Sequence, residues 1–504
     1  MSNGELAARW YTDGVMKTEL PAPDSPELDY LLSDLYNACD PNEAASKDYY
    51  ADLSKARGNT SLADKVLRVL KREARSDSYV RYLFSGHNGG GKSSELLHLV
   101  ELLNSFENRT LGRRYFPIYL DTDEYLNNND TSLPDLLLAI VAEIGSALSK
   151  PPLKIDIADD YFVDLFKRVR ETFAQEYGAS SLDMGGQVSS NIGGVQALAS
   201  LKTVITPLKR DESARSKVRN ALKGQVETLR GEINRILDGA RLKLKQHNYR
   251  AGEFPYTDIV LIVDSLDRVR RFGGEEKVEE AVYELFVRNA PTLTGLNVHT
   301  IYTLPLRALY AYPGDLQSAY GIAPFTMPMV AVEKRREPGV AYIKGRDCLK
   351  AMLAQRLKGY SPDAIFTQDA LDWLLATSGG HARSLMIFAR AAFADTDELP
   401  VDLATARKAT APTFEAYSRS IPPSYWTKLS VVHRERTVDK SDDEYRNMLE
   451  QLMVLEYRNG DDEPNDLAEP WYAVNPLVRL LSGFKAVSES ASSSDGTQRI
   501  VSEG

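Results

Sequence analysis

The sequence has little cysteine, no long apolar run and no excess of positive charge. Its two cysteines, Cys39 and Cys348, lie far apart without CxxC or Cys/His spacing, which argues against a disulfide framework and a zinc site. No apolar run approaches the roughly 18 residues of a membrane span, and Met1 to Leu20 lack the pattern of a secretion signal. These absences predict a cytoplasmic protein with no membrane partner.

Length and charge limit the number of domains and the classes of partner that can be expected. A chain of 504 residues exceeds one ordinary hydrophobic core, so two or three domains are expected. The apolar share of 43% and charged share of 26% are typical of globular proteins. The net charge of −10 disfavours bulk electrostatic binding of duplex DNA and leaves open only a local basic patch.

Strand and helix patterns alternate along the first two thirds of the chain. Short β-rich segments occur at 79–84, 115–120, 259–263, 298–303 and 326–332. Helical patterns separate them, and this order predicts parallel strands. We therefore expect an α/β fold: a parallel five-stranded P-loop NTPase core with a helical insertion, followed by a helical lid and a winged-helix domain. The expected domains are an N-terminal arm or helical cap (1–60), the core (61–335) with its insertion (150–250), the lid (336–410), the winged helix (411–483) and a disordered tail (484–504).

The insertion combines a Gly-, Ser- and Gln-rich stretch at 176–200 with a long helix. Val218, Leu222, Val226, Leu229, Ile233 and Leu237 follow at helical spacing in that helix. Its dense Lys and Arg residues favour a solvated face, with a nucleic-acid or partner surface as the alternative.

A glycine-rich run is the strongest chemical signal. Residues 86–93 read Gly-His-Asn-Gly-Gly-Gly-Lys-Ser, match G-x-x-x-x-G-K-[ST], and stand between a predicted strand and a predicted helix. Backbone N–H groups of such a loop surround phosphate oxygens, and the positive helix end points at the same charge. The predicted nucleotide contacts are Gly86, Asn88, Gly89, Gly90, Gly91, Lys92, Ser93 and Ser94. Lys92 is expected on the β- and γ-phosphates, and the Ser93 hydroxyl on Mg²⁺.

The segment 259–264 is an apolar strand that ends in a carboxylate. Such a buried strand is expected to deliver Asp264 to the metal ion as the Walker B acid. Ser265 follows directly, and a second acid, Asp267, lies three positions on. Asp267 either orients or deprotonates the attacking water, or is a carboxylate favoured at a helix N-terminus.

Several further residues are candidates with two open interpretations each. Thr303, at the end of the strand 298–303, is either a γ-phosphate sensor or a strand terminus. His381 or Arg383 contacts nucleotide from the lid, or belongs to a helix-start turn. The sequence does not choose an arginine finger among Arg268, Arg270, Arg271, Arg288 and Arg307.

The segment 425–481 has the pattern of a winged helix. Two helices precede two strands, 454–457 and 471–474, with a polar turn between them. The second helix, 442–452, carries Asp442, Asp443, Glu444 and Glu450 against one arginine, Arg446. That charge is poor for reading a DNA groove, so packing on the core is favoured over DNA binding.

Together these motifs resemble the STAND class of signal-transduction ATPases, relatives of AAA+ and origin-recognition ATPases. The resemblance covers roughly residues 60–480. It rests most on Asp264-Ser265-Leu266-Asp267, the pattern of NACHT-type proteins, and on residues 379–383, which look like an origin-recognition second sensor. It implies ATP as the nucleotide and a switch in which ADP holds a closed form and ATP permits oligomerisation. Since Ser265 stands where AAA+ enzymes have Glu, it also implies slow turnover.

The resemblance suggests a role for the protein. Bacterial members often act beside effectors in anti-phage defence, and no effector domain is recognisable here, so a separate effector protein is expected. The competing hypotheses are a DNA-binding loader or transposition-type ATPase, and a protein that binds nucleotide for structure alone. The presence of Lys92, Ser93 and Asp264 disfavours the last.

Overall fold

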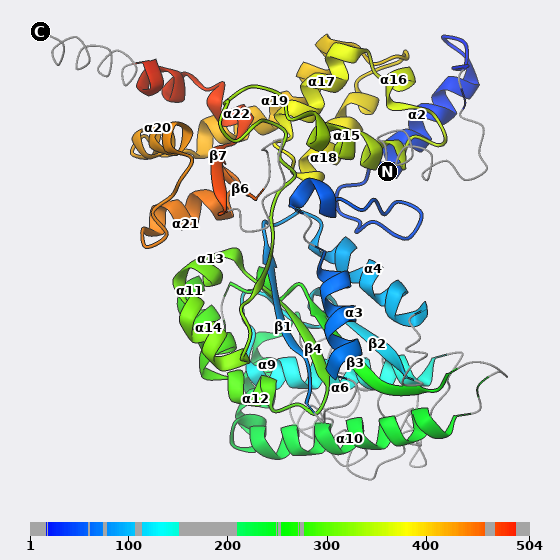
Figure 1. The fold of residues 1–504 in the computed structure, drawn as a ribbon, viewed down its shortest axis with the longest axis vertical. Helices are drawn as coiled ribbons and strands as arrows, with labels where there is room; N and C mark the ends of the chain where they lie inside the picture. The colour runs from blue at the N-terminus through cyan, green and yellow to red at the C-terminus, as the bar shows by residue number, and fades with distance from the viewer. Residues whose placement is uncertain are drawn as a thin grey trace, which may run out of the picture. The chain divides into compact units, whose positions relative to one another are not determined.

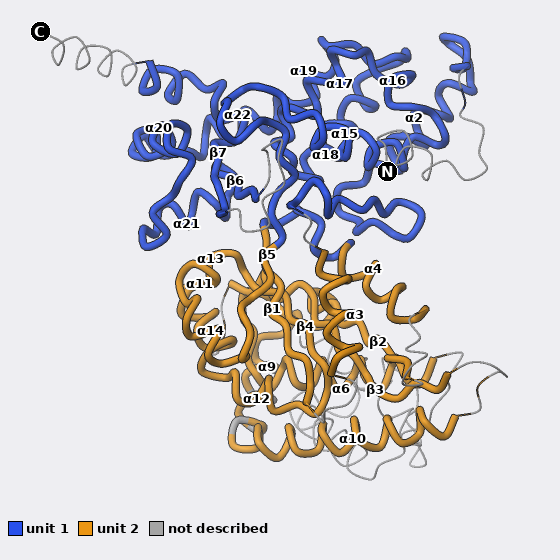
Figure 2. Tube along the Cα trace, viewed as in Figure 1, with its two compact units in different colours: residues 1–60, 87–94, 327–504 blue, residues 61–86, 95–326 orange. Residues whose placement is uncertain are grey.

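The computed structural model describes eleven stretches of the chain. They are residues 17, 19–58, 61–73, 78–105, 113–150, 209–247, 249, 254–270, 272, 277–458 and 469–489. The chain forms two compact units, coloured separately in Figure 2. Unit 1 comprises Met1–Thr60, His87–Ser94 and Met327–Gly504, and unit 2 comprises Ser61–Gly86 and Glu95–Thr326.

The sheet has the strand order β2-β3-β4-β1-β5 (Figure 1). Its strands are β1 (Arg81–Gly86), β2 (Arg114–Asp121), β3 (Tyr256–Asp264), β4 (His299–Leu304) and β5 (Phe325–Met327). The pairs β2–β3, β3–β4 and β4–β1 are parallel, as the alternating pattern predicts. In register, Asp121 stands opposite Asp264, and Phe84 opposite Thr303. The carboxyl ends of these strands therefore share one edge of the sheet.

The helices of unit 2 precede and connect the strands of the sheet. They are α3 (Leu62–Glu73), α4 (Lys92–Ser105), α5 (Thr122–Tyr125), α6 (Leu133–Ser149), α9 (Glu212–Leu222), α10 (Val226–Gln246), α11 (Val278–Tyr283), α12 (Ala290–Thr294), α13 (Leu306–Ala311) and α14 (Pro313–Tyr320). Helix α6 is apolar almost all round and almost wholly buried, and α10 packs on β3 through its apolar stripe. Strand β3 lies between β2 and β4, and the burial of its residues on both faces explains its apolar run.

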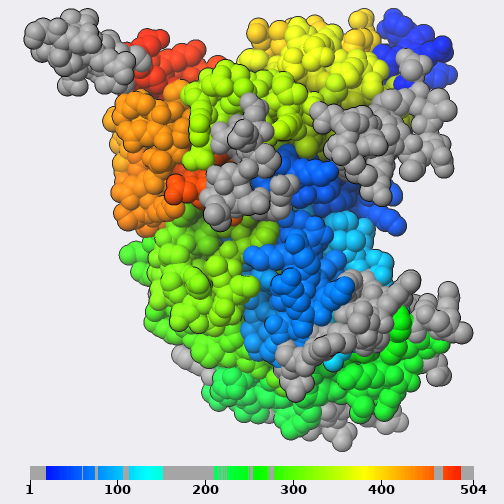
Figure 3. Space-filling view, viewed as in Figure 1, coloured from blue at the N-terminus to red at the C-terminus, as the bar shows by residue number. Residues whose placement is uncertain are grey.

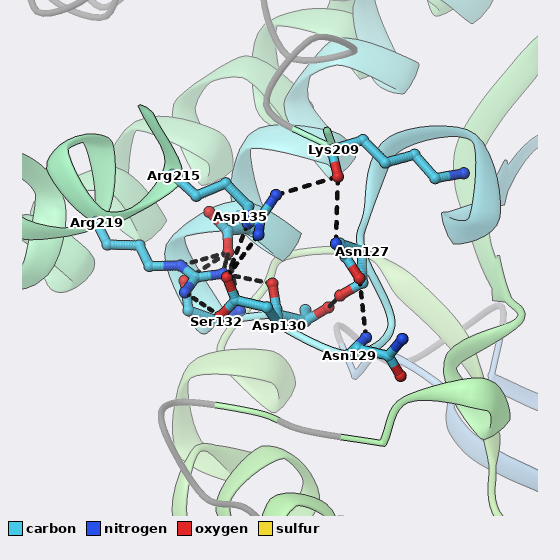
Figure 4. Close-up of polar contacts among 9 residues, drawn as sticks. Asn127, Asn129, Asp130, Ser132, Asp135, Lys209, Arg215 and Arg219 are labelled. Carbon is cyan, nitrogen blue, oxygen red and sulfur yellow. Dashed lines mark hydrogen bonds and ion pairs between the residues drawn. The ribbon is translucent and has the colours of Figure 1, made fainter. Parts of the chain in front are cut away.

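The expected long helix of the insertion is interrupted. A 3₁₀ turn, Lys223–Gln225, separates α9 from α10 and contains Gly224, which costs conformational entropy in a helix interior. Figure 4 shows Arg219 of α9 pointing toward Asp130 and Asp135 on the segment that begins α6. The Gly-, Ser- and Gln-rich stretch at 176–200 lies outside the described residues.

Unit 1 contains a helical lid with its own core. Its helices are α2 (Pro26–Ala38), α15 (Ile343–Ala354), α16 (Pro362–Ile365), α17 (Gln368–Thr377), α18 (Ala382–Ala394) and α19 (Leu403–Ser420). Helix α2, from the N-terminal arm, packs on α18, so the arm shares the core of the lid. Helix α19 runs continuously through residue 410, where the sequence suggests the end of the lid.

The winged helix follows α19. It comprises α20 (Tyr425–Glu435), α21 (Asp443–Glu450), β6 (Val454–Tyr457), β7 (Trp471–Val474) and α22 (Pro476–Arg479). Strands β6 and β7 are antiparallel, and the Tyr457 and Trp471 rings stack with centroids 4.5 Å apart. Residues 482–489 are helical, including the start of the expected disordered tail, and residues 490–504 lie outside the described part.

The last predicted strand is shorter than expected. The pattern 326–332 suggests one continuous strand, whereas β5 ends at Met327, directly before Pro328, which has no N–H to donate to a sheet. Beyond the proline, the N–H of Met329 donates to the Glu456 carbonyl at 2.9 Å. The segment after Pro328 therefore bonds to the wing.

The predicted fold class is confirmed: an α/β P-loop NTPase core with a five-stranded parallel sheet, a helical lid and a winged helix. None of the helices in the described ranges is both long and apolar enough to cross a membrane.

Candidate functional site

The glycine-rich loop connects β1 to α4. Strand β1 ends at Gly86 and α4 begins at Lys92, as the motif requires. Gly89 and Gly91 have φ of +75° and +102°, which side chains rarely adopt, and the Gly90 N–H closes a turn onto the His87 carbonyl at 3.1 Å. The Lys92 ammonium donates to the same carbonyl at 2.9 Å.

Three consecutive loop carbonyls accept hydrogen bonds from other segments of unit 1. Nε2 of His381 donates to the Asn88 carbonyl at 2.6 Å, and the Arg383 N–H to that of Gly89 at 3.2 Å. Nη2 of Arg57 donates to the Gly90 carbonyl at 2.6 Å. In a planar trans peptide the C=O and N–H point in opposite directions. Each bond therefore points the N–H of the same peptide, on Gly89, Gly90 or Gly91, away from its donor, and the Gly90 N–H is the one that closes the turn onto His87.

The start of α18 fixes the orientation of the His381 side chain. It is the N-cap of α18, where its Nδ1 accepts from the Ser384 N–H at 3.2 Å, so the proton is on Nε2. Burial lowers the pKa of His381 to about 4, and the nearby positive charges of Arg383 and Lys92 add to this. The neutral imidazole is therefore a fixed donor to the loop at neutral pH.

His87 connects the loop to the winged helix. Its Nδ1 donates to the Leu449 carbonyl at 3.0 Å, and its Nε2 accepts from the Glu456 N–H at 3.0 Å. Burial lowers the pKa of His87 to about 3, helped by the charges of His381 and Lys92. The tautomer is thus fixed by one donor and one acceptor on the wing.

The remaining loop candidates have different surroundings. Ser94 accepts a hydrogen bond at its hydroxyl from the N–H of Ala45 in the N-terminal arm, at 2.9 Å. Ser93, the predicted Mg²⁺ ligand, is half-buried at the start of α4. Nε of Arg383 donates to the Pro41 carbonyl at 3.1 Å. The loop therefore contacts the arm as well as the lid.

In unit 2, Asp264 is almost fully buried and held by two donors. The Tyr119 hydroxyl donates to Oδ2 and the Ser265 N–H to Oδ1, each at 2.7 Å. Burial, then the charge of Asp264, raises the pKa of Tyr119, so this phenol stays a donor. Ser265 has φ +66°, a left-handed conformation uncommon outside glycine, which turns the chain sharply after the carboxylate. These two bonds fix the orientation of the carboxylate.

Thr303 and Asp267 lie at the turn that follows β3. The Thr303 hydroxyl is fully buried and accepts from the Leu266 N–H at 2.9 Å. Asp267 is buried in a three-residue 3₁₀ turn, Leu266–Arg268, and not at the start of an α-helix. Thr303 thus holds the backbone of the turn that follows Asp264.

The end of β2 also lies beside Asp264, which was not predicted from the sequence. The Thr122 hydroxyl donates to the Asp264 carbonyl at 2.8 Å, and Asp123 forms an ion pair with Arg268. The signal was available, because polar residues at the carboxyl ends of adjacent parallel strands meet at one sheet edge.

The four candidate arginines that the structure describes each contact a different partner. Arg268 pairs with Asp123, Arg288 with Glu284 at 2.5 Å, and Arg307 with Glu279 at 3.0 Å. Arg270 donates its N–H to the Asn128 carbonyl at 2.7 Å, and Arg271 lies outside the described residues. The structure does not select an arginine finger.

The second helix of the wing has acidic residues at its N-terminus. Asp442 caps α21, and Asp443 and Glu444 occupy its first turn. Lys428 of α20 forms ion pairs with Asp442 and Glu444. Helices α20 and α21 lie at the surface on the face shown in Figure 3, in orange. The acidic start of α21 is therefore partly neutralised within the domain.

Comparison with known proteins found matches among solved structures. No protein-family model and no curated protein sequence matches the chain. A Walker-type ATPase of Pyrococcus abyssi is 14% identical, with 88% of this chain and 98% of that chain covered and a TM-score of 0.39. Cdc6p of Pyrobaculum aerophilum is 12% identical, with coverages of 90% and 98% and a TM-score of 0.37. Drosophila ORC bound to DNA is 12% identical, with coverages of 93% and 95% and a TM-score of 0.34.

Proposed function

We propose that this protein binds ATP with Mg²⁺ on the loop Gly86 to Ser94 and hydrolyses it slowly as a regulatory switch. The observation that carries the proposal is the set of three carbonyl contacts on Asn88, Gly89 and Gly90. They point the N–H groups of the same peptides away from these donors, among them those of Gly89 and Gly91, and backbone N–H groups directed in this way just before a helix are the arrangement that binds phosphate.

Charge at the loop supports a polyphosphate ligand. Lys92 lies on the loop, and Arg57 and Arg383 lie beside it, while His87 and His381 are neutral at pH 7 because burial lowers the pKa of each. A loop with cations and no protonated histidine has a fixed positive charge that an anion can offset.

The roles of individual residues follow from their chemistry. Lys92 is assigned to the β- and γ-phosphates, and Ser93 and Asp264 to the cation. Mg²⁺ is commonly held by one or two carboxylates, phosphate oxygens and waters, and it would neutralise charge on the phosphates. Asp267 is assigned to orienting or deprotonating the attacking water. Thr303 is assigned to holding the turn that contains Asp267, and Arg383 to contacting the nucleotide from the lid.

The switch proposal rests on the connection between loop and wing. His87 belongs to the loop and bonds to the backbone on both α21 and β6, so a change in the loop alters two contacts of the winged helix. From the resemblance to STAND ATPases we extend the proposal to ATP-dependent self-assembly and control of a separate effector, in bacterial anti-phage defence.

The alternative is a DNA-binding loader or transposition-type ATPase that uses the winged helix. The acidic first turn of α21 weighs against it, because a groove-reading helix needs positive charge near phosphates. Absence of a duplex shift at low salt, with ATP present, would exclude this alternative.

Two variants test nucleotide binding and turnover. Lys92→Ala should abolish binding of a fluorescent ATP analogue, and Asp264→Ala should reduce Mg²⁺-dependent phosphate release while binding persists. Lys350→Ala, which removes a lysine of α15 paired with Asp363, is the matched control. Wild-type turnover in both site variants would contradict the assignment.

A mass measurement tests the switch. Light scattering should give a larger particle with Mg²⁺ and a non-hydrolysable ATP analogue than with ADP. The same mass in both nucleotides would rule out ATP-gated assembly and leave nucleotide binding to stand on its own.

A further inference from the structure

Arg57 is a buried arginine of the N-terminal arm, distant in sequence from the loop that it contacts. Only 5% of the residue is exposed, and its Nη2 donates to the Gly90 carbonyl at 2.6 Å. Nη1 lies 3.0 Å from the sulfur of Met327. A Cβ added to Gly91 would lie 3.7 Å from Nη2, so the guanidinium borders two successive loop glycines.

The contact orients one peptide of the loop. The Gly90 carbonyl points toward Arg57, so the N–H of Gly91, on the same planar peptide, points away from it. Gly91 has φ +102°, a conformation in which the backbone has little intrinsic preference to stay, because glycine populates many alternatives. A charge-assisted hydrogen bond is about twice as strong as a neutral one and is suited to holding such a peptide.

We propose that Arg57 is a positioning residue for phosphate binding, which holds the Gly90–Gly91 peptide so that the Gly91 N–H faces the bound anion. This inference rests on the proposed function, since it concerns the same loop. It gives the N-terminal arm a role in nucleotide affinity that the glycine motif alone does not indicate. The physical gain is preorganisation, because a loop already in its bound conformation loses less entropy on binding.

The arm contacts the site at two further points, which supports the proposal. The Ala45 N–H donates to the Ser94 hydroxyl at 2.9 Å, and the Pro41 carbonyl accepts from Nε of Arg383 at 3.1 Å. Arg57 is also among the cations that lower the pKa of His381, the donor to the Asn88 carbonyl. The arm is thus bonded to the loop and to the lid residues that hold it.

The test compares variants of Arg57 and Arg356 in the 504-residue chain. Arg57→Met keeps the aliphatic volume and removes the donors, and we expect affinity for a fluorescent ATP analogue to fall about tenfold to a hundredfold. Arg57→Lys keeps the positive charge without the planar guanidinium donors, and its affinity should fall less. Arg356→Met is the matched control, because Arg356 is also buried in unit 1 but donates to the carbonyls of Tyr49 and Met352. It should retain wild-type affinity.

Two readouts separate positioning from general stability. In amide hydrogen exchange without nucleotide, the peptide over residues 86–94 should exchange faster in Arg57→Met than in wild type. In Arg356→Met its exchange rate should equal that of wild type. Added guanidinium at millimolar concentration should restore part of the binding in Arg57→Ala. Wild-type affinity and exchange in Arg57→Met and Arg57→Lys, with binding lost in Lys92→Ala, would overturn the role of Arg57 and leave the nucleotide proposal intact. No binding by the wild-type protein would overturn both.

Discussion

The His87 imidazole donates from Nδ1 to the carbonyl of Leu449 at 3.0 Å, which joins the second residue of the glycine loop to the end of α21. The ring also accepts the Glu456 N–H, so both nitrogens are satisfied by the wing. A buried group with one donor and one acceptor in use cannot take a second proton without losing a bond.

Acid should destabilise the protein through its buried histidines. Burial lowers the pKa from 6.5 to about 3 in His87 and to about 4 in His381 and His433. Between those values and 6.5 the unfolded state binds more protons than the folded state, so stability is full above pH 6.5 and falls as the pH drops. Each histidine contributes a slope of up to about 1.4 kcal/mol per pH unit.

Urea unfolding at several pH values between 5 and 7 measures this slope. His87→Gln and His381→Asn should each reduce the slope by the contribution of about one proton, up to about 1.4 kcal/mol per pH unit. A wild-type free energy of unfolding that stays constant from pH 6.5 to 5 would contradict the assignment of neutral, buried histidines.

Tyr119→Phe should slow hydrolysis without abolishing nucleotide binding. The substitution removes the donor that holds Oδ2 of Asp264, so the carboxylate loses its fixed orientation. Loss of a residue that orients a metal ligand commonly costs about 10- to 100-fold in activity. Steady-state phosphate release with Mg²⁺ measures the effect.

Tyr302→Phe is the control for that experiment. It removes a buried hydroxyl of β4 that donates to the Leu293 carbonyl at 3.3 Å. Equal losses of activity in both variants would show a general effect of burial and not one on Asp264.

Gly89→Ala should impair both the loop and its packing with the lid. A Cβ there would lie 2.8 Å from Nε2 of His381 and 2.9 Å from the Cβ of Arg383, at φ +75°. Gly359→Ala is the matched control, because it has φ +89° with no atom within 4 Å of the added Cβ. It should cost only about 1 kcal/mol of backbone strain.

Nucleotide titration and thermal unfolding distinguish the two glycine variants. We expect Gly89→Ala to lose nucleotide binding and Gly359→Ala to retain it. Retained binding in Gly89→Ala would show that the lid does not restrict this side of the loop.

Arg219→Met should destabilise unit 2 by about 3 kcal/mol, since it leaves a buried carboxylate without its ion partner. Nε and Nη2 of Arg219 lie 2.8 and 2.7 Å from Oδ2 of Asp135 (Figure 4), and burial raises the pKa of that carboxyl. Urea unfolding measures the loss.

Arg235→Met provides the comparison for the ion pair. Arg235, on α10, is exposed and pairs with Glu232 within the same helix. Its loss should change the free energy by at most about 0.5 kcal/mol. Equal effects of the two substitutions would show that the Arg219 network contributes no more than a surface pair.

The sequence predicted the parts of the fold that depend on local pattern. The strand, loop and helix around residues 86–94 and the wing strands 454–457 and 471–474 lie where the periodicity and glycine spacing indicate. It failed where one residue interrupts a long pattern: Pro328 ends a predicted strand, and Gly224 lies in the break between α9 and α10. Both residues act on backbone conformation, which apolar periodicity does not report.

What the sequence by itself determined is the glycine-rich loop and the apolar strand that ends at Asp264, because short-range spacing and apolar runs encode both. Only the tertiary structure decided which groups hold them. Arg57, His381 and Arg383 meet the loop, and Tyr119 meets Asp264, across long sequence separations. Such partners are selected by how helices and strands pack, and a carbonyl accepts equally well from any donor that the packing brings within reach.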